Sequence, residues 1–443
     1  MGAFLEKPIT EKKTDEGVGK GLKYGVSAMQ GWRKEMEDKH VCSTNFSLPE
    51  HAFFGVFDGH AGVGASTYCS ENLLIRVVEL LKDKPTPSIE EIKTALSAGF
   101  LALDVDLRKV PGWSSGEIRG GTTAVTVMIT PDKIIWGNCG DSRGILCRSG
   151  EVHFVTQDHK PSNDGERKRI EKAGGSVMMQ RVNGSLAVSR ALGDFEFKMV
   201  DDLGPTEQLV SPEPEMTVLD RDNEHDEFLL LACDGVYDVM SNEEVIKFVG
   251  NKLKLTSNLP QICSDLIDLC LHKNSRDNMS VILITFEGAP QVSEEAIAED
   301  KKLQEKVHAF IREVIKKLVE VASDPLELEE NEVLMRVGEA AKTDEVLLEY
   351  DFSSQRPFVV DVLAEKKKEK FGEPRNYDGP TDASEAPSDF FFRHPADDIF
   401  PSQPPPTVPM EEGGSDSPLI TENPPTTDGL SSPLQTDSST NSV

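Results

Sequence analysis

Short runs of apolar and β-branched residues, separated by Gly, Asp and Asn, dominate the chain from Leu22 to Phe286. Runs of this kind, bounded by turn-forming residues, predict the strands of a sheet. The clearest predicted strands are Phe53–Phe57, Thr122–Ile129, Ile134–Trp136, Gly144–Cys147, Phe228–Cys233 and Ser280–Phe286.

Two longer stretches within this region have helical spacing instead. Apolar residues recur every three or four positions after the capping box Ser88-x-x-Glu91, and Ser241-x-x-Glu244 begins a second such stretch. Many strands with a few amphipathic helices predict an α+β fold, in which two packed sheets are covered by helices. The first apolar stripe consists of Ile89, Ile92, Leu96, Phe100, Leu103 and Leu107.

The pattern changes again after Pro290. An apolar stripe on a charged helix, from Leu303 to Val321, is followed by helical stretches around Val333–Ala341 and Phe358–Phe371. Amphipathic helices normally bury such a stripe, so it predicts the core of a small helical appendage rather than a partner site. The predicted organisation is an N-terminal extension (1–21), a main domain (22–288), a helical domain (289–372) and a tail (373–443).

The tail, residues 373–443, is acidic and rich in Pro, Ser and Thr. It has 13 acidic against 2 basic residues and 13 of the 27 prolines of the chain. Such a composition buries too little apolar surface to offset chain entropy, so disorder is expected. Its apolar clusters are either a docking motif or an accident of composition: Phe390, Phe391, Phe392, Ile399 and Phe400.

Composition limits the function classes. A net charge of −30, from 47 basic and 77 acidic residues, argues against a nucleic-acid binder, which needs a basic face. Seven cysteines without a C-x-x-C pair predict free thiols in a reducing compartment rather than disulfides or a zinc ribbon. No apolar leader or membrane span is visible in the sequence, so a cytosolic or nuclear location is expected.

Four aspartates lie at the ends of strand-like runs, each beside a small or turn-forming residue: Asp58, Asp141, Asp234 and Asp277. A single Asp-Gly is more often a turn. A group of such carboxylates at one rim of a sheet, however, needs a metal ion or hydrogen bonds to offset desolvation. Because the candidate ligands are all oxygen, Mg²⁺ or Mn²⁺ is expected, and two ions about 3.5–4 Å apart would activate a water for attack on phosphorus.

Seven motifs, in order along residues 22–286, resemble those of the type 2C metal-dependent protein serine/threonine phosphatases. The start Met1-Gly-Ala-Phe and the helical segment after Pro290 are most similar to the animal alpha and beta forms. The motifs are Gly31-Trp32-Arg33-x-x-Met36-Glu37-Asp38, Asp58-Gly59-His60-Ala61-Gly62, Gly120-Gly121-Thr122-Thr123-Ala124, Gly140-Asp141-Ser142-Arg143, Ser185-Leu186-Ala187-Val188-Ser189-Arg190-Ala191-Leu192-Gly193-Asp194, Asp234-Gly235-x-x-Asp238 and Arg276-Asp277-Asn278-Met279-Ser280.

The resemblance implies a β-sandwich of two antiparallel sheets flanked by helices, with two Mg²⁺ or Mn²⁺ ions at one end. It also implies a role for each matching residue. Asp58 bridges both metals and Gly59 ligates one through its carbonyl; Asp234 and Asp277 complete the second metal; Glu37 and Asp38 act through metal-bound waters; Asp141 and Asp238 support a weaker third metal.

The same resemblance makes Arg33 the bidentate clamp on the substrate phosphate, a task that suits a guanidinium. His60 directly follows the metal-bridging pair and is expected to protonate the departing serine or threonine oxygen. Arg181 is expected near the cleft, as a second candidate for binding the substrate phosphate. The segment Gly204–Glu215 is expected to be a flap that influences substrate choice, unless it is an ordinary surface loop.

The sequence disfavours two other functions. Asp104-Val-Asp106 resembles the Asp-x-Asp of haloacid-dehalogenase-like phosphatases, but it lies in a helical pattern and Arg108 replaces the expected Thr or Val. A catalytically dead scaffold that binds phosphoproteins is disfavoured by the intact Asp58, His60 and their partners.

Further expectations concern location and partners. Gly2 gives a partial N-myristoylation motif, because Glu6 replaces Ser or Thr, and one acyl chain would allow only reversible membrane contact. The expected protein is a monomer in the cytoplasm and nucleus, with a membrane-associated fraction. Its expected substrates are phosphoproteins such as protein kinases and signalling proteins, and its expected role is negative regulation of stress or kinase signalling.

Overall fold

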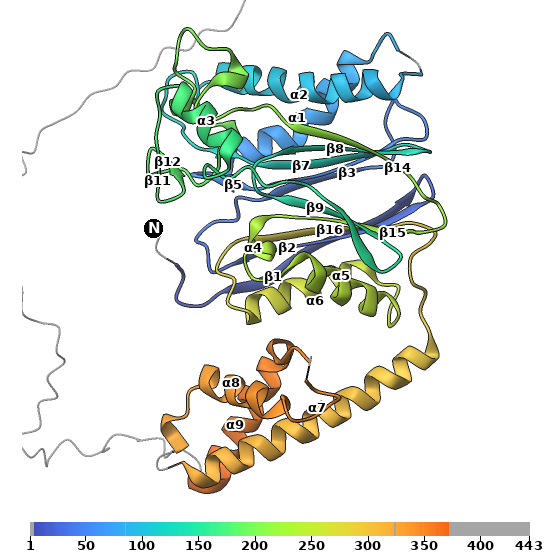
Figure 1. Ribbon diagram of the computed structural model, residues 1–443, viewed down its shortest axis with the longest axis vertical. Coiled ribbons are helices and arrows are strands. Elements are labelled where there is room, and N and C mark those ends of the chain that lie inside the picture. Colours follow the sequence, from blue (N-terminus) through green and yellow to red (C-terminus); the bar gives the residue numbers. More distant parts are fainter. Residues whose placement is uncertain (1–3, 85, 323–324, 349, 372–443) are drawn as a thin grey trace, which may run out of the picture. The chain divides into compact units, whose positions relative to one another are not determined.

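The computed structural model describes residues 4–84, 86–322, 325–348 and 350–371. The expected tail, its phenylalanines and Gly2 lie outside these residues. Two antiparallel sheets are stacked face to face (Figure 1). The six-stranded sheet has the order β1 (Ile9–Gly19), β2 (Leu22–Gly31), β16 (Met279–Thr285), β15 (Asp226–Ala232), β9 (Arg143–Arg148) and β10 (Glu151–Val155). The five-stranded sheet has the order β14 (Glu215–Asp220), β8 (Lys133–Cys139), β7 (Ala124–Ile129), β4 (Ala52–Phe57) and β3 (Lys39–Ser43).

Helices cover the outer face of each sheet (Figure 1). The helices α1 (Gly64–Leu80) and α2 (Ile89–Lys109) pack on the five-stranded sheet, and α5 (Asn242–Leu253) and α6 (Leu259–His272) pack on the six-stranded sheet. The predicted capping boxes form at Ser88 and Ser241, the N-caps of α2 and α5. The predicted α+β sandwich flanked by helices is therefore confirmed.

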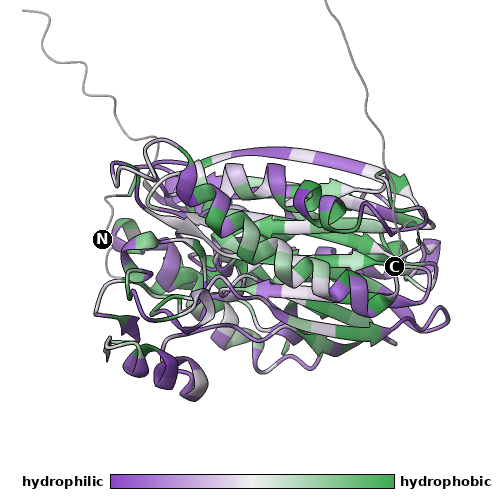
Figure 2. Ribbon diagram, turned by 90° about the horizontal axis from the view of Figure 1, so that it is seen from above, coloured by the Kyte–Doolittle hydropathy of each residue, from purple (hydrophilic) through white to green (hydrophobic). Residues whose placement is uncertain are grey.

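The alternation of side chains along β4 shows how the layers are built. Phe53 and Phe57 pack under α1 and α2, whereas Phe54 and Val56 pack between the two sheets. Figure 2 shows the central strands mostly in the colour of hydrophobic residues. Gly144 is required in this inner layer, because a Cβ at that position would lie 2.2 Å from the ring of Trp136. Both faces of the central strands are thus buried, and the acidic side chains of the candidate site lie at or beyond the strand ends.

Two predicted elements differ in the structure. The run Thr122–Ile129 divides into β6 (Gly121–Thr122) and β7, because the backbone N–H of Thr123 donates to the carbonyl of Asp58 at 2.9 Å instead of continuing the ladder. The expected N-terminal extension contains β1, which pairs with β2 from Gly19↔Leu22 onward. As an exposed edge strand, β1 consists mostly of charged and polar residues, and so lacks the apolar signal of the inner strands.

The residues after Pro290 form a helical bundle of α7 (Glu294–Val321), α8 (Glu330–Ala341) and α9 (Arg356–Phe371). Most of the predicted stripe on α7 packs on α8 and α9 in one apolar cluster, but Val321 at its end is exposed. The interpretation of this stripe as a core face is therefore confirmed for these residues. The buried members on α7 are Val307, Ile311, Ile315 and Val319.

A candidate metal centre at the rim of the sandwich

Two of the predicted carboxylates meet at one end of the sandwich. Carboxylate oxygens of Asp38 and Asp58 and the Sγ of Cys233 all lie within 4.8 Å of one another. Asp58 directly follows β4, and its carbonyl accepts hydrogen bonds from the backbone N–H of Thr123 at 2.9 Å and the hydroxyl of Thr122 at 3.0 Å. The end of a buried strand therefore presents the Asp58 carboxylate at a fixed position.

The carboxylates around this point repel one another. Burial raises the pKa of Asp58 well above its ordinary value, and the neighbouring charges of Asp38 and Asp234 raise it further. Burial likewise raises the pKa of Asp234, with Asp141 and Asp277 contributing. So many acidic groups with shifted pKa values in one place are typical of a functional site. A bound cation would remove the repulsion.

The surroundings of the Asp38 carboxylate indicate whether a metal ion fits this site. Its side chain is 3% exposed, and neither carboxylate oxygen has a hydrogen-bond partner among the described residues. Burial raises its pKa to about 6. The hydroxyl of Ser280 and the thiol of Cys233 lie close enough to stabilise the charge, but neither meets hydrogen-bond geometry to Asp38. A buried carboxylate without partners is costly, so this group of oxygens suits a hard divalent cation.

Glu37 and Gly59 are held against each other beside these carboxylates. The backbone N–H of Glu37 donates to Oδ1 of Asn278 at 2.8 Å, and its side chain accepts from the backbone of Gly62. A Cβ on Gly59 would lie 2.5 Å from the carbonyl oxygen of Glu37, so only glycine fits there. Asn278 also donates to the carbonyl of Gln30 at 2.8 Å and so fixes the loop that carries Glu37.

Asp141 and Asp238 lie near Asp234, whose pKa is raised by burial and then by the charges of both. Asp141 is buried and forms an ion pair with the ammonium of Lys160. Asp238 is the C-cap of the short helix α4 (Asp234–Tyr237), and burial raises its pKa. Lys160 was not identified from the sequence; it precedes Pro161 in a segment without any motif that marks a charge partner.

Arg33 lies between the carboxylates and solvent. Its guanidinium donates to Oδ2 of Asp277 at 2.6 Å, and its side chain is 43% exposed. Burial lowers the pKa of Arg33, but the hydrogen bond to Asp277 and the charge of Asp58 raise it more, so the net pKa is raised. A protonated guanidinium that is anchored at one end and open at the other can bind an anion.

Arg181 takes a different position. It lies in β12 (Arg181–Val182), which pairs with β11 (Val177–Met178) in an exposed hairpin. Its Nη1 donates to the carbonyl of Ser185 at 2.7 Å, and no contact joins it to the carboxylates among the described residues. The structure therefore does not bring Arg181 together with the other predicted site residues.

The expected flap, Gly204–Glu215, is anchored along much of its length. Gln208, Val210 and Ser211 are buried, and Gln208 holds the chain through hydrogen bonds to Val200 and Leu203. Its influence on substrate choice stays a prediction.

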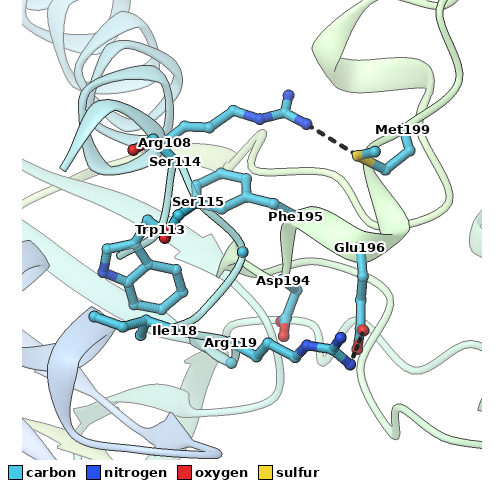
Figure 3. Close-up of a pocket in the computed structure, with 12 residues that line it drawn as sticks. Arg108, Trp113, Ser114, Ser115, Ile118, Arg119, Asp194, Phe195, Glu196 and Met199 are labelled. Carbon is cyan, nitrogen blue, oxygen red and sulfur yellow. Dashed lines mark hydrogen bonds and ion pairs between the residues drawn. The ribbon is translucent and has the colours of Figure 1, made fainter. Parts of the chain in front are cut away.

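His60 has a buried carboxylate partner. It lies in β5 (Gly59–His60), and its Nε2 is 2.8 Å from Oδ2 of Asp194, whose side chain is 4% exposed. Burial lowers the pKa of His60, but Asp194 raises it more, so the net pKa is raised and the imidazolium form is favoured. Asp194 also forms part of the wall of a neighbouring pocket (Figure 3). The role of Asp194 was not identified from the sequence, although it ends one of the seven motifs.

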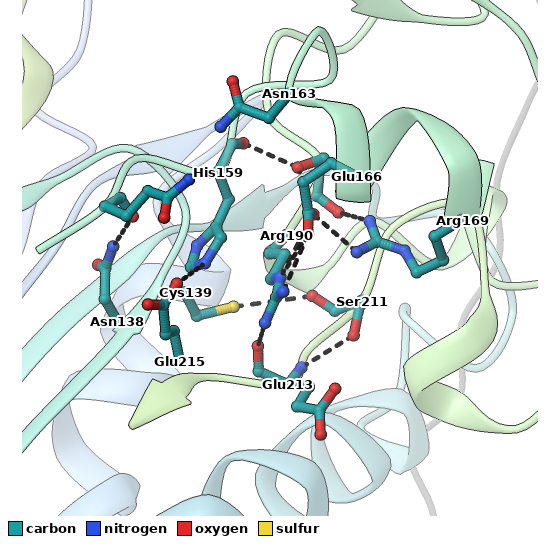
Figure 4. A network of polar contacts seen from close by, with 12 residues as sticks. Asn138, Cys139, His159, Asn163, Glu166, Arg169, Arg190, Ser211, Glu213 and Glu215 are labelled. Atoms are coloured by element: carbon teal, nitrogen blue, oxygen red, sulfur yellow. Dashed lines mark hydrogen bonds and ion pairs between the residues drawn. The ribbon is translucent and has the colours of Figure 1, made fainter. Parts of the chain in front are cut away.

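A network around Glu166 supports the segment that carries Asp194 (Figure 4). Glu166 lies in α3 (Asp164–Lys172) and accepts hydrogen bonds from Arg169 at 2.6 Å, Ser189 at 2.6 Å and Arg190 at 2.9 Å. Arg190 also donates to the carbonyl of Glu213 at 3.0 Å. Buried charged groups of this kind are stable only when all their partners are present.

Glu166→Gln is expected to destabilise the protein in a pH-dependent way. Burial raises the pKa of Glu166, but Arg190, Arg169 and Ser189 outweigh it and lower the net pKa to about 2. The difference from the ordinary value of 4.5 corresponds to about 3 kcal/mol. Because the folded-state pKa is lowered, this stability is present above pH 4.5 and is lost as the pH falls toward 2.

Urea unfolding of wild type and Glu166→Gln at a series of pH values measures this effect. The difference in the free energy of unfolding between the two proteins should be constant from neutral pH down to about pH 4.5 and become smaller below that pH. Glu171→Gln, an exposed position of the same helix, is the matched control and should change little. A difference in unfolding free energy that does not become smaller in acid would contradict the stabilising role assigned to the Glu166 carboxylate.

A sandwich with a buried carboxylate and several further acidic groups at its rim, and with an arginine and a histidine beside them, has the features of a metal-dependent phosphoester hydrolase. The profile of the family "Protein phosphatase 2C" matches residues 22–279, and that of "Protein serine/threonine phosphatase 2C, C-terminal domain" matches residues 280–343. The chain belongs to the protein phosphatase 2C family. It is a metal-dependent protein serine/threonine phosphatase, as its motifs predicted.

Known relatives agree with this assignment. The chain is 51% identical over 329 residues to "Protein phosphatase 1A" of Homo sapiens, which covers 73% of this chain and 86% of the relative. It is also 51% identical over 327 residues to "Protein phosphatase 1B" of Mus musculus, covering 72% and 84%. Its fold is similar to that of a Toxoplasma gondii phosphatase, with a TM-score of 0.54, 28% identity and coverage of 64% of this chain and 97% of the other. A C. elegans sex determining protein matches with a TM-score of 0.53 and 26% identity, covering 60% and 65%.

Proposed function

We propose that this phosphatase hydrolyses phosphoserine and phosphothreonine with two Mg²⁺ or Mn²⁺ ions held by Asp58, Asp234, Asp277 and the carbonyl of Gly59. The observation that carries the proposal is the buried carboxylate of Asp38, which lies beside Asp58 and accepts no hydrogen bond from any described residue. When bound, the cations supply a water nucleophile and neutralise charge on the phosphate. Glu37 and Asp38 would act on the cations through bound waters, and Asp141 with Asp238 would hold a weaker third cation.

The remaining roles belong to three cationic side chains. Arg33 binds the phosphate oxygens with the N–H groups of its guanidinium that do not donate to Asp277. His60, held protonated by Asp194, donates a proton to the departing serine or threonine oxygen. Arg181, on its exposed hairpin, is assigned to a substrate segment farther from the carboxylates.

The proposal extends to the cellular role. Substrates are phosphorylated protein kinases and signalling proteins, so the enzyme acts as a negative regulator of stress or kinase signalling. It works as a monomer in the cytoplasm and nucleus, and an acyl chain on Gly2 adds reversible membrane contact. Within the described residues, no helix has both the length and the apolar character needed to cross a membrane.

Removal of metal tests the proposed chemistry. Phosphate release from a phosphothreonine peptide is expected to stop when EDTA is added and to return when excess Mn²⁺ or Mg²⁺ is restored. The metal-free protein should keep its far-UV circular dichroism, which separates loss of metal from loss of fold. Full activity in EDTA would contradict the two-metal mechanism. Intact-mass measurement that shows an unmodified Gly2 would remove the acyl proposal.

A further inference from the structure

A pocket separate from the carboxylates opens beside the His60–Asp194 pair (Figure 3). It lies between the end of α2 with the following loop and the segment that begins at Asp194, and its volume is about 380 Å³. A volume of this size accommodates one large side chain with part of its backbone. The lining includes Arg108, Trp113, Ile118, Arg119, Phe195 and Met199.

The pocket shares two residues with the surroundings of the general acid. Asp194 lines the pocket and also contacts Nε2 of His60 at 2.8 Å. Gly120 lines it too, and a Cβ there would lie 2.3 Å from the carbonyl oxygen of His60. The pocket therefore lies next to the residue proposed to protonate the leaving oxygen, close enough for a neighbouring side chain of the substrate to enter it.

The floor of the pocket is aromatic. The rings of Trp113 and Phe195 meet edge to face at 90°, with centroids 5.8 Å apart, and Trp113 is buried in the cluster beneath α1 and α2. Met199, 67% exposed, contributes a flexible thioether at the rim. Aromatic and methionine side chains of this kind bind bulky apolar groups.

The rim carries two arginines with different partners. Arg119 pairs with Glu196 at 3.4 Å, but Arg108 contacts the carbonyl of Lys198, the Sδ of Met199 and the face of Phe195. No carboxylate pairs with Arg108 among the described residues. In a chain of net charge −30, an arginine left without a carboxylate at the edge of a pocket favours an acidic ligand.

We propose that this pocket is a substrate subsite, which binds a bulky apolar side chain of the phosphoprotein while an adjacent acidic residue pairs with Arg108. The proposal rests on the phosphatase mechanism above and adds a sequence preference to it. The apolar side chain fills the space over Trp113 and Phe195. The acidic residue lies at the mouth, where the guanidinium of Arg108 is exposed.

Kinetics on matched phosphothreonine peptides, with the full chain and Mn²⁺, test the subsite. In one series of peptides, a Phe-Glu pair is placed at successive positions on each side of the phosphothreonine. Matched peptides carry Ala-Glu or Phe-Lys at the same positions. At one placement, kcat/KM should be about tenfold higher for Phe-Glu than for either matched peptide, mainly through KM. Arg108→Glu should reverse the preference between Phe-Glu and Phe-Lys at that placement. Met199→Asp should reduce the preference for Phe over Ala.

Lys109→Glu is the matched control, because it makes the same charge change on the same turn of α2 without lining the pocket. It should leave the ratio between Phe-Glu and Phe-Lys unchanged. The subsite is overturned if no placement shows a preference, or if Arg108→Glu slows both peptides equally. If the wild-type chain with Mn²⁺ hydrolyses none of the peptides, the underlying two-metal proposal fails instead.

Discussion

Asp58→Asn is expected to lower kcat/KM for a phosphothreonine peptide by on the order of 10³-fold or more, the range seen when one member of a catalytic unit is removed. The substitution keeps the shape of the side chain but removes the charge proposed to bridge both cations. The same change removes repulsion from Asp38 and Asp234, which raises the pKa of Asp58 in the folded protein. The metal-free variant is therefore expected to melt at a higher temperature than the metal-free wild type.

Two measurements made together distinguish this expectation from a simple loss of fold. Phosphate release reports activity, and thermal melting with and without Mn²⁺ reports metal binding through the stabilisation that a ligand gives to the native state. Wild type should gain stability from Mn²⁺, whereas Asp58→Asn should gain little. Asp83→Asn, at an exposed position, is the control and should match wild type in both measurements. An Asp58→Asn protein that is less stable without metal would contradict the electrostatic argument.

Much of the fold could be predicted because its signals are local. The capping boxes at Ser88 and Ser241 mark helix starts through contacts within four residues, and buried strands such as β4 consist of uninterrupted apolar residues. The division between β6 and β7 could not be predicted in this way. It depends on the hydrogen bond from Thr123 to Asp58, which joins positions far apart in the sequence.

The candidate site shows the same contrast. Asp58, Asp38 and Asp234 were identified because each belongs to a short motif, and the structure brings them into one electrostatic group. The residues that position the site could not be identified in this way, because each contacts a partner far away in the sequence. Asn278 holds Gln30, 248 positions away, and Asp194 contacts His60, 134 positions away. Nothing in the residues around Asn278 or Asp194 indicates these partners, so only the fold reveals them.

Stability and function are therefore divided among different acidic residues of one fold. Glu166 has a lowered pKa because two arginines surround it, and it stabilises the segment that carries Asp194. Asp58 and Asp38 have raised pKa values because they are buried and because neighbouring carboxylates repel them, and they destabilise the metal-free protein. Electrostatic repulsion of this kind lowers the stability of the metal-free protein, and stabilising interactions elsewhere in the fold offset it. It is expected at a site where a bound cation supplies the missing positive charge.

Asp194→Asn is expected to slow the hydrolysis of phosphothreonine by about 10²-fold while it slows p-nitrophenyl phosphate much less. Asp194 has a left-handed backbone, with φ of 48°, which asparagine tolerates, so the fold should survive. Without the carboxylate, His60 loses the contact that raises its pKa and orients its ring. A threonine alkoxide is a strong base that must be protonated as it leaves, whereas nitrophenolate leaves without a proton.

The ratio of the two rates therefore separates proton donation from a general loss of structure. His60→Gln should show the same selective loss, and combining it with Asp194→Asn should add little, because both changes remove one proton-donating unit. Asp202→Asn, an exposed position close by in the sequence, should leave the ratio unchanged. An equal loss on both substrates would mean that Asp194 only supports the fold around Gly121, where its carboxylate also packs closely. A selective loss requires that the carboxylate acts through the imidazole, because p-nitrophenyl phosphate depends on the same carboxylates and the same Arg33 but not on the proton.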